Sequence, residues 1–405
     1  MLRHYLTRFN NNALRYGRQL QLRTFASKNP SQWRKTDHDT KKQPQISTPG
    51  RRYIEVDSPL AKANRYTYVK PDDPFYASEK VTRILSMGTV DDAADYVKAL
   101  PIYLQSTVVW NQLLGYCARH GRANYAENYY VQMRKRGFEP NERTFTHMLT
   151  AYAKSNSPQA VEQAESWIQK MKDFNLQPST IHINNLMRVY NNNQLAKKTI
   201  ETLKRISVDT MTIPDAVTYT IALQACPQLP HGIDSINYIW RDVMFRLEKK
   251  SRQPTSLLAQ KAQKIAVSSE PTVATSARDA DLAIDDSLVV ALLNATAQSA
   301  HRQDDIIVVL TTLDRLYSLC PPEADQIMRK YHVDRKTGFG FPLSVKVLDA
   351  ILRFSGRVKQ YKLGQVYYQL ALQQYPRLKP DKYCLSAINW IDKQVKPRPS
   401  FHKRK

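Results

Sequence analysis

Apolar side chains between residues 107 and 141 recur at helical spacing in two separate stripes. The first stripe is Trp110, Leu113, Leu114 and Cys117, and the second is Ala126, Tyr129, Tyr130 and Met133. Both follow the i, i+3, i+4, i+7 spacing of one helix face. Gly121 separates the stripes and Pro140 follows the second one, so the pattern predicts two amphipathic helices joined by a turn.

The same plan recurs along the chain with a near-constant period. Units 107–141, 142–179 and 180–215 each carry two stripes and end in a proline followed by Asn, Ser or Asp. A fourth unit, 216–250, starts with the same stripe before the period fails. One helix pair cannot bury its apolar face alone. The recurrence therefore predicts an all-α fold, an α-solenoid (superhelix) of stacked antiparallel helix pairs with a concave inner surface.

Weaker signals extend the expected stack on both sides. Residues 74–106 are typical of a degenerate helix pair, and 282–395 of degenerate C-terminal pairs with a capping helix. Residues 251–281 are rich in Ser, Thr, Ala and Gln, which favours a flexible insertion, and 396–405 form a basic tail. The helices expected beyond the insertion cover about 285–301, 304–319, 344–355, 359–375 and 383–393.

The first 25 residues have the composition of a mitochondrial transit peptide. Arginines alternate with Leu, Tyr and Phe, and no acidic residue occurs before Asp37. The stretch Arg23-Thr24-Phe25-Ala26-Ser27 resembles a matrix-protease cleavage site and leaves 26–73 as a disordered basic and polar lead-in. This predicts a location in the mitochondrial matrix. The alternative is that 1–25 form a basic disordered arm that binds RNA directly.

The charge of the chain favours a polyanionic partner. The formal net charge is +24, and residues 1–36 contribute eight Lys and Arg to it, so the remaining chain is still basic. Nucleic acid or a ribosomal surface is the expected partner, and an anionic membrane surface is the weaker alternative. No apolar run approaches the ~20 residues of a membrane span. Four isolated cysteines, without paired histidines at ligand spacing, predict neither a disulfide framework nor a metal site.

The repeated units resemble the pentatricopeptide repeat of mitochondrial P-type RNA-binding proteins. The 35-residue period, the Pro-Asn or Pro-Asp ending, Asn111 after Trp110, and Met133 and Met171 late in the second helices carry the resemblance. It covers 107–226 well, 74–106 and 340–395 weakly, and 251–281 not at all. The rival is the peptide-binding tetratricopeptide repeat, which favours a small residue at motif position 8. That position holds Leu114, Leu149 and Met187 here.

The resemblance implies that each repeat reads one RNA base through motif positions 5 and 35. The implied base-recognition residues are Asn111 with Asn141, Thr146 with Ser179, Asn184 with Asp215, and Thr220 without an assigned partner. In the family's code the first pair reads a pyrimidine and leans to cytosine, and the third reads uracil. Thr146 leans to a purine, but Ser179 departs from the expected Asn or Asp. The alternative is that these residues only cap helices.

Two further motif positions are implied to contact RNA. Position 2 sandwiches the bases, and Val108, Ile181 and Val217 supply the usual aliphatic side chain there, whereas Arg143 departs from it. Position 13 faces the phosphates, and Arg119 and Lys154 match. The alternative for these two cations is a favourable place near a helix C-terminus.

Catalytic motifs of the kind that some pentatricopeptide proteins carry are absent from the sequence. An editing deaminase needs His-x-Glu with Pro-Cys-x-x-Cys, and a nucleotide site needs a Gly-rich loop; neither occurs. The densest acidic group, Asp279 to Asp286, is typical of a helix N-terminus. We therefore expect no enzyme, no cofactor and no metal.

The sequence thus predicts a mitochondrial protein that holds single-stranded RNA, an mRNA or rRNA precursor, on the concave face of a helical-repeat scaffold. Its role would lie in RNA processing, stability, splicing, translation or small-subunit rRNA maturation. The alternative is a structural or assembly factor associated with the mitochondrial ribosomal subunit, without base-specific readout. A peptide-binding adaptor is the third possibility.

Overall fold

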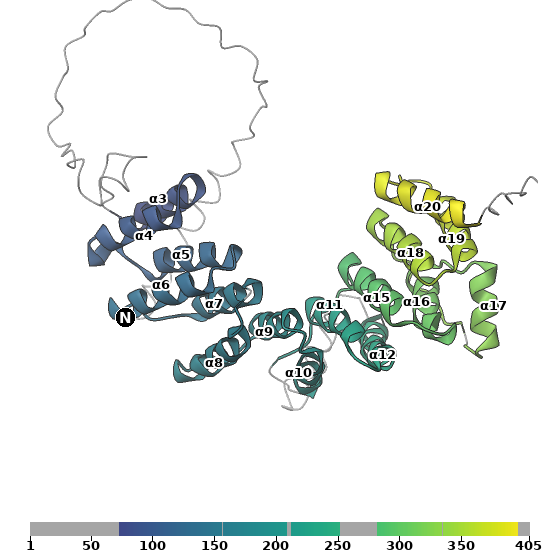
Figure 1. Cartoon of the computed structure of the whole chain (residues 1–405), viewed down its shortest axis with the longest axis horizontal. Helices are drawn as coiled ribbons and strands as arrows, with labels where there is room; N and C mark the ends of the chain where they lie inside the picture. Colours follow the sequence, from purple (N-terminus) through teal and green to yellow (C-terminus); the bar gives the residue numbers. More distant parts are fainter. Residues whose placement is uncertain (1–72, 156, 209–211, 252–281, 334, 396–405) are drawn as a thin grey trace, which may run out of the picture. The chain divides into compact units, whose positions relative to one another are not determined.

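A computed structural model describes residues 73–155, 157–208, 212–251, 282–333 and 335–395 of the chain (Figure 1). Within these ranges all regular elements are helices, and the helices form stacked pairs, which confirms the expected fold class. The expected transit peptide 1–25, the lead-in up to residue 72, residues 252–281 of the insertion and the tail 396–405 lie outside the described residues.

Each pair consists of a first and a second helix. The first helices are α3 (Pro74–Met87), α5 (Thr107–Arg119), α7 (Glu142–Lys154), α9 (Thr180–Asn192), α11 (Ala216–Ala225), α15 (Asp286–Ser299), α18 (Val345–Arg357) and α20 (Lys382–Val395). The second helices are α4 (Val90–Ala99), α6 (Ala123–Lys135), α8 (Ala160–Asp173), α10 (Ala196–Val208), α12 (Gly232–Ser251), α16 (Ile307–Tyr317) and α19 (Tyr361–Gln374). Short 3-10 turns lie at Ile102–Leu104, Cys226–Gln228 and Asp304–Ile306.

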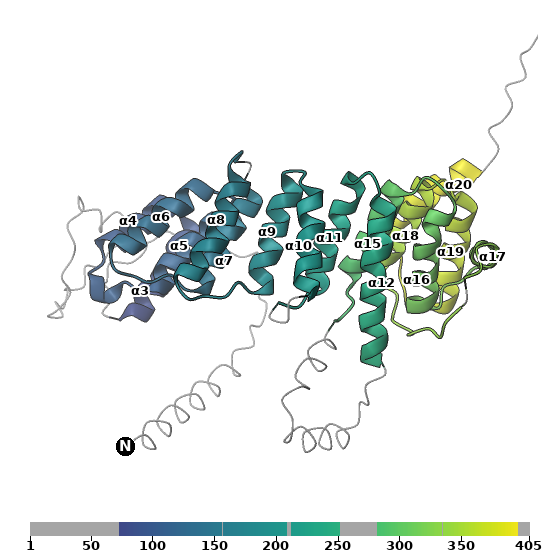
Figure 2. The ribbon, with the colours of Figure 1, turned by 90° about the horizontal axis from the view of Figure 1, so that it is seen from below.

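The first helices pack on one another in chain order. Each one from α3 to α20 contacts the next, including α11 and α15, which flank the insertion (Figures 1 and 2). We call this series the first-helix layer. The second helices pack against their own partners, and several also contact the first helix of the next pair. Equivalent residues of successive first helices therefore recur along one layer.

Helix α17 (Pro322–Lys330) stands apart from this alternation and was not predicted from the sequence. It follows α16 and runs across the direction of α16 and α19 (Figure 2). Only Ala324 and Met328 of its nine residues are buried. Two apolar positions are too few to establish a helical period, which explains why the pattern did not indicate this helix.

The apolar stripes form two clusters of buried side chains that meet on α9. Leu186 and Val189 of α9 belong to the cluster of α3 to α9, and Ile183 and Met187 belong to the cluster of the later helices. Both faces of α9 are therefore buried. One continuous series of packed helices results, as stacked repeats require.

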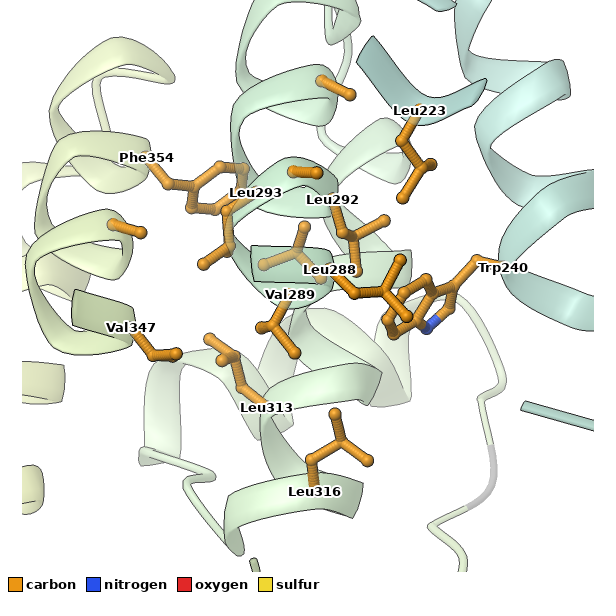
Figure 3. Close-up of a cluster of buried hydrophobic side chains, with 14 of the residues drawn as sticks. Leu223, Trp240, Leu288, Val289, Leu292, Leu293, Leu313, Leu316, Val347 and Phe354 are labelled. Atoms are coloured by element: carbon orange, nitrogen blue, oxygen red, sulfur yellow. The ribbon is translucent and has the colours of Figure 1, made fainter. Parts of the chain in front are cut away.

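Helix α15 joins the helices on either side of the insertion. Its side chain Leu288 points toward Trp240 of α12, and Leu293 points toward Phe354 of α18 (Figure 3). Leu288, Leu292 and Leu293 are at most 1% exposed. The helices after the insertion thus continue the same core and do not form a separate one.

Tyrosine–carboxylate hydrogen bonds tie the second helices α6 and α8 to the first helix of the next pair. The Tyr190 hydroxyl donates to Glu165 of α8 at 2.9 Å, and the Tyr152 hydroxyl donates in the same way to Glu127 of α6. Burial, reinforced by the carboxylate, raises the pKa of both phenols. These tyrosines stay protonated and act as donors that fix the spacing of adjacent repeats.

The turn inside the first well-formed repeat requires glycine. Gly121 has φ +65°, and a Cβ there would lie 2.5 Å from the carbonyl oxygen of Lys154 in the next first helix. Any other residue would combine a left-handed backbone with a clash against backbone. This contact places the end of α5 directly beside the end of α7.

Candidate nucleic-acid interface

The fifth residue of α5 and the N-cap of α7 are held together by hydrogen bonds. Asn111 Nδ2 donates to Asn141 Oδ1 at 3.1 Å, and Thr144 Oγ1 donates to Asn111 Oδ1 at 2.8 Å. The backbone N–H of Thr144 also donates to Asn141 Oδ1 at 3.1 Å, which completes the N-cap of α7. The structure thus brings this predicted pair into direct contact, and the Thr144 hydroxyl bridges the same two side chains.

The same arrangement recurs at α9 and α11 with a carboxylate in place of the amide. Asn184 Nδ2 donates to Asp215 Oδ1 at 3.1 Å, and Thr218 Oγ1 donates to Asn184 Oδ1 at 2.7 Å. The backbone N–H of Thr218 donates to Asp215 Oδ1 at 2.7 Å. This predicted pair is therefore also in direct contact, and Thr218, the third residue of α11, bonds to both side chains.

The two pairs differ in the atom that stays free. The cap bond from a backbone N–H fixes Oδ1 as the inward atom of both Asn141 and Asp215, and both side chains belong to exposed residues. Among the described residues, no group bonds to Asn141 Nδ2 or to Asp215 Oδ2. The first pair therefore presents a hydrogen-bond donor outward, and the third presents an acceptor.

In the second predicted pair an imidazole lies between the two residues. Ser179 N donates to His182 Nδ1 at 3.1 Å, so Nδ1 is the acceptor nitrogen and Nε2 carries the proton. His182 Nε2 lies 3.1 Å from Thr146 Oγ1 and 3.1 Å from the Glu142 carbonyl. Burial lowers the pKa of His182, which keeps this ring neutral. Thr146 and Ser179 are thus joined through His182 and do not touch directly.

The sequence left Thr220 without an assigned partner, and the structure shows which residue caps the first helix that follows α11. Helix α11 packs against α15, whose N-cap is Asp285. Asp285 Oδ1 accepts the N–H of Leu288 at 2.9 Å, as Asp215 accepts that of Thr218. Asp285 therefore occupies the place that Asp215 has in the preceding repeat, across the whole insertion.

The predicted stacking residues lie exposed at equivalent places of successive first helices. Val108, Ile181 and Val217 are 57%, 59% and 39% exposed, and Arg143 is exposed as well. Each is the second residue of its helix. Single exposed apolar residues are common, but three at the same motif position form a regular row beside the polar pairs.

A hollow of about 530 Å³ lies at the first of these positions. It is lined by α3, α5 and α7, with Val108, Asn111, Asn141, Arg143 and His147 among its residues. An aliphatic side chain, a polar pair and a guanidinium thus converge on one space. This combination suits a planar ring with polar edges next to an anion.

The predicted phosphate contacts Arg119 and Lys154 stand at the ends of α5 and α7. Lys154 Nζ donates to the carbonyl oxygen of Arg119 at 3.4 Å, and the Arg119 guanidinium lies 5.9 Å from the Tyr116 ring. Both groups are exposed. The lysine bond satisfies a terminal carbonyl of α5, as expected for a cation at a helix C-terminus, and leaves two further ammonium protons for other acceptors.

His147 lies in the same hollow against Gly115. A Cβ at Gly115 would come within 3.2 Å of His147 Cε1, so the glycine makes room for the ring. Burial, together with the nearby Arg143 and Arg119, lowers the pKa of His147 to about 4. The ring is therefore neutral at physiological pH, and the cations around it are not offset by any acid in the hollow's lining.

This low pKa predicts a component of acid lability. Between the unfolded pKa of about 6.5 and the folded pKa of about 4, the unfolded chain binds the proton, so stability falls as pH falls. We expect the wild type to lose about 1 kcal/mol more unfolding free energy than His147→Gln between about pH 7.5 and pH 5, after discounting for partial exposure. Urea unfolding of both proteins measures this, and equal losses would contradict it.

Neither a metal site nor a membrane span was found in the part of the chain that the structure describes. No group of three or more His, Cys, Asp or Glu side chains is close enough to hold a metal ion there. No described helix is both long enough and apolar enough to cross a membrane.

Models of known repeat families match the same part of the chain as these polar pairs. A PPR repeat family model matches residues 105–154, and a pentatricopeptide repeat domain model matches residues 130–193. The matched segment runs from α5 to the end of α9 and contains the first two polar pairs.

Pentatricopeptide repeat-containing proteins of Arabidopsis thaliana are similar to the chain. A mitochondrial one is 35% identical over 79 residues, which are 20% of this chain and 11% of that protein. Another is 26% identical over 156 residues, 38% of this chain and 15% of that protein. A chloroplastic one is 24% identical over 37% of this chain and 19% of its own length. The chain thus spans less than a fifth of the length of these relatives.

A solved structure of the pentatricopeptide repeat protein PPR10, in complex with an 18-nt psaJ RNA element, is similar over 82% of this chain and 58% of its own. The identity is 12% and the TM-score is 0.37. A structure of PPR10 from maize is similar over 80% of this chain and 48% of its own, with 13% identity and a TM-score of 0.27.

Proposed function

We propose that this protein, whose residues 105–193 are pentatricopeptide repeats, holds single-stranded mitochondrial RNA along the first-helix layer. The RNA would be an mRNA or rRNA precursor, in processing, stability, splicing, translation or small-subunit rRNA maturation. One observation carries the proposal. At equivalent places of α5/α7 and α9/α11, an outward polar atom lies beside an exposed aliphatic side chain. Stacking on the one and hydrogen bonding to the other is how single-stranded bases are bound.

The free atoms support different bases at the two pairs. Asp215 Oδ2 can accept the N3–H of uracil, whereas cytosine presents an unprotonated N3 that would repel it. Asn141 Nδ2 can donate to that cytosine nitrogen. The geometry thus supports uracil at the Asn184/Asp215 pair and cytosine at the Asn111/Asn141 pair, in agreement with the family's code.

Thr220 with Asp285 is the fourth pair in this proposal. Thr220 lies on α11, Asp285 caps the contacting helix α15, and Asp285 has the same capping role as Asp215. The RNA path would therefore continue past the insertion onto α15. The Thr146/Ser179 pair contributes less, because its hydroxyls are engaged by His182.

The salt dependence of RNA binding tests the proposal. The measurement uses residues 26–405, because the five arginines within 1–25 would bind RNA unspecifically. We expect binding of single-stranded RNA whose log Kd rises with log salt, with a slope of about 0.7 per phosphate contacted. Arg119→Gln with Lys154→Gln should lower that slope by about 1.4 if each cation contacts one phosphate. Absence of RNA binding at low salt would overturn the proposal.

The mitochondrial location is part of the same proposal. It is supported by the acid-free, Arg-rich residues 1–25 and by relatives that are named mitochondrial, although another is named chloroplastic. We expect import into isolated mitochondria with removal of a segment ending near Ala26. Retention outside the organelle would contradict the matrix location.

A second candidate function is a structural or assembly factor of the mitochondrial ribosomal subunit, without base readout. It is favoured because the hydroxyls of Thr146 and Ser179 both contact His182. The second polar pair then has no free hydroxyl to read a base, and the series of base-reading pairs is interrupted. In that case the protein should co-sediment with a ribosomal subunit after nuclease treatment. Sedimentation as a free protein would count against this candidate.

A further inference from the structure

A second hollow, of about 390 Å³, lies between α18 and α20 at the far end of the first-helix layer. Its walls combine aromatic rings with guanidinium groups. The lining residues that matter here are Arg353, Gly356, Arg357, Tyr383, Ser386 and Trp390. None of them belongs to the residues that the repeat resemblance implies for RNA contact.

The register of the helices places this hollow on the same side as the polar pairs. Tyr383 is the second residue of α20, as Val108 is of α5, and Ser386 is the fifth, as Asn111 is. Trp390 corresponds to Gly115 as the ninth residue, and Arg357 of α18 corresponds to Arg119 as the thirteenth. The hollow at α5 is lined by residues of these same positions. The two hollows are therefore equivalent sites at different places of one layer.

Trp390 is an exposed ring that is held in place. It is 48% exposed, whereas Trp110, Trp167 and Trp240 are at most 3% exposed. Its ring lies against the backbone of Gly356, where a Cβ would come within 2.8 Å of Trp390 Cζ3, and its centroid is 5.7 Å from that of Tyr361 in an edge-to-face arrangement. The indole is thus fixed by packing on one side and open on the other. A pre-positioned aromatic face loses little entropy when a second ring stacks on it.

The charge around this ring is positive. Arg353 pairs with Asp349 at 2.8 Å, whereas no carboxylate of the described residues pairs with Arg357, whose Nη1 donates to Asn294 Oδ1 at 3.3 Å. Arg357 also borders an adjoining hollow of about 310 Å³ together with His301, Arg302 and Lys359. Arg357, which lines both hollows, therefore offers its charge to an anion next to the indole, and Lys359 adds a charge in the adjoining hollow.

We propose that this hollow is a second RNA anchor, in which an unpaired base stacks on Trp390 beside Tyr383 and Arg357 binds the adjoining phosphate. The inference rests on the proposed function, since it continues the same RNA along the same layer. It differs from the polar pairs in one respect. An exposed aromatic ring, Trp390, lies in the hollow, so the site holds a base by stacking on its ring, which tolerates any base.

Tryptophan fluorescence of the full chain tests this anchor, because stacking of a base quenches an exposed indole. Trp33 lies outside the described residues, so both the parent and its variants carry Trp33→Phe. With polyadenylate we expect a loss of Trp390 emission that is absent with an abasic ribose-phosphate polymer of equal length. The buried Trp110, Trp167 and Trp240 should not respond.

Affinity measurements on variants complete the test. Trp390→Ala should weaken polyadenylate binding by about 5- to 150-fold, the range for loss of one base–aromatic stack. Trp390→Phe should keep most of the affinity, and its thermal unfolding should match that of the parent. Arg357→Gln should lower the salt slope by about 0.7. Tyr125→Ala removes a comparably exposed ring from the second helix α6 and serves as the matched control with unchanged affinity.

The outcomes separate this inference from the proposed function. If the parent binds polyadenylate but its emission stays constant and Trp390→Ala binds equally well, the anchor is refuted while RNA binding stands. If no variant, including the parent, binds RNA at low salt, the proposed function falls and the anchor with it.

Discussion

Asp215→Asn is expected to change the base preferred at one nucleotide from uracil to cytosine. The variant keeps an Oδ1 that can accept from Thr218 N and Asn184 Nδ2, as Asn141 does in the earlier repeat, so the cap of α11 survives. Only the outward atom changes, from an acceptor to a donor. Swapping the favoured base should cost about 1–3 kcal/mol, or about 5- to 150-fold in relative affinity.

Competition between RNAs that differ at a single position measures this preference. Asn141→Asp is the matched reverse change and should shift the first pair from cytosine toward uracil. Asn184→Ala with Asp215→Ala should lose discrimination at that nucleotide while the helical content is retained. An equal change in affinity for all four bases would mean that these residues do not read a base edge, and that their polar groups serve the helix caps alone.

Leu292→Ala is expected to cause the largest loss of stability, about 3 kcal/mol. Leu292 is fully buried on α15, within the cluster that joins α11 and α12 to α16 and α18 (Figure 3). Removing its branched end leaves a cavity that fixed helices on several sides cannot close. The exposed Gln298→Ala on the same helix is the control and should change stability by less than about 0.5 kcal/mol.

Urea unfolding monitored by helical content measures both variants. We expect the loss to appear in the transition of the helices on both sides of the insertion, because α15 packs against both. A separate transition for the helices after the insertion, alone affected by Leu292→Ala, would show that residues 282–395 fold independently of the preceding repeats.

The helix pairs could be predicted from the sequence because each helix buries a stripe of apolar side chains at a fixed spacing. Trp110, Leu113 and Leu114 form such a stripe and are fully buried. The N-caps of α7 and α11 could also be predicted, because Asn141 and Asp215 follow prolines and directly precede helices. The short helix α17 could not be predicted, because it buries only two side chains and two positions do not define a helical period.

The residues that bridge the polar pairs could not be predicted in the same way. Thr144, His182 and Thr218 share one offset, the third residue of a first helix, but their role depends on contacts across more than 30 residues of chain. That shared offset was the available signal. Asp285 was expected at a helix start, which the structure confirms. Its pairing with Thr220 could not be predicted, because it depends on the packing of α11 against α15, which lie on opposite sides of the insertion in the sequence.

The Trp390 site shows a further limit of pattern analysis. A tryptophan in a stripe predicts a buried side chain, as holds for Trp110 and Trp167. Trp390 is exposed because Gly356 leaves room for the ring at the surface of α18. Only the spatial neighbour, 34 positions earlier in the chain, distinguishes the two cases.

Crosslinking of RNA containing 4-thiouridine, with the attached peptides located by mass spectrometry, tests the central claim most directly. RNA that lies along the first-helix layer should attach to peptides of α5, α7, α9 and α11, around Val108, Arg143, Ile181 and Val217. Attachment confined to the second helices α6, α8 and α10, or to residues 1–72, would contradict it.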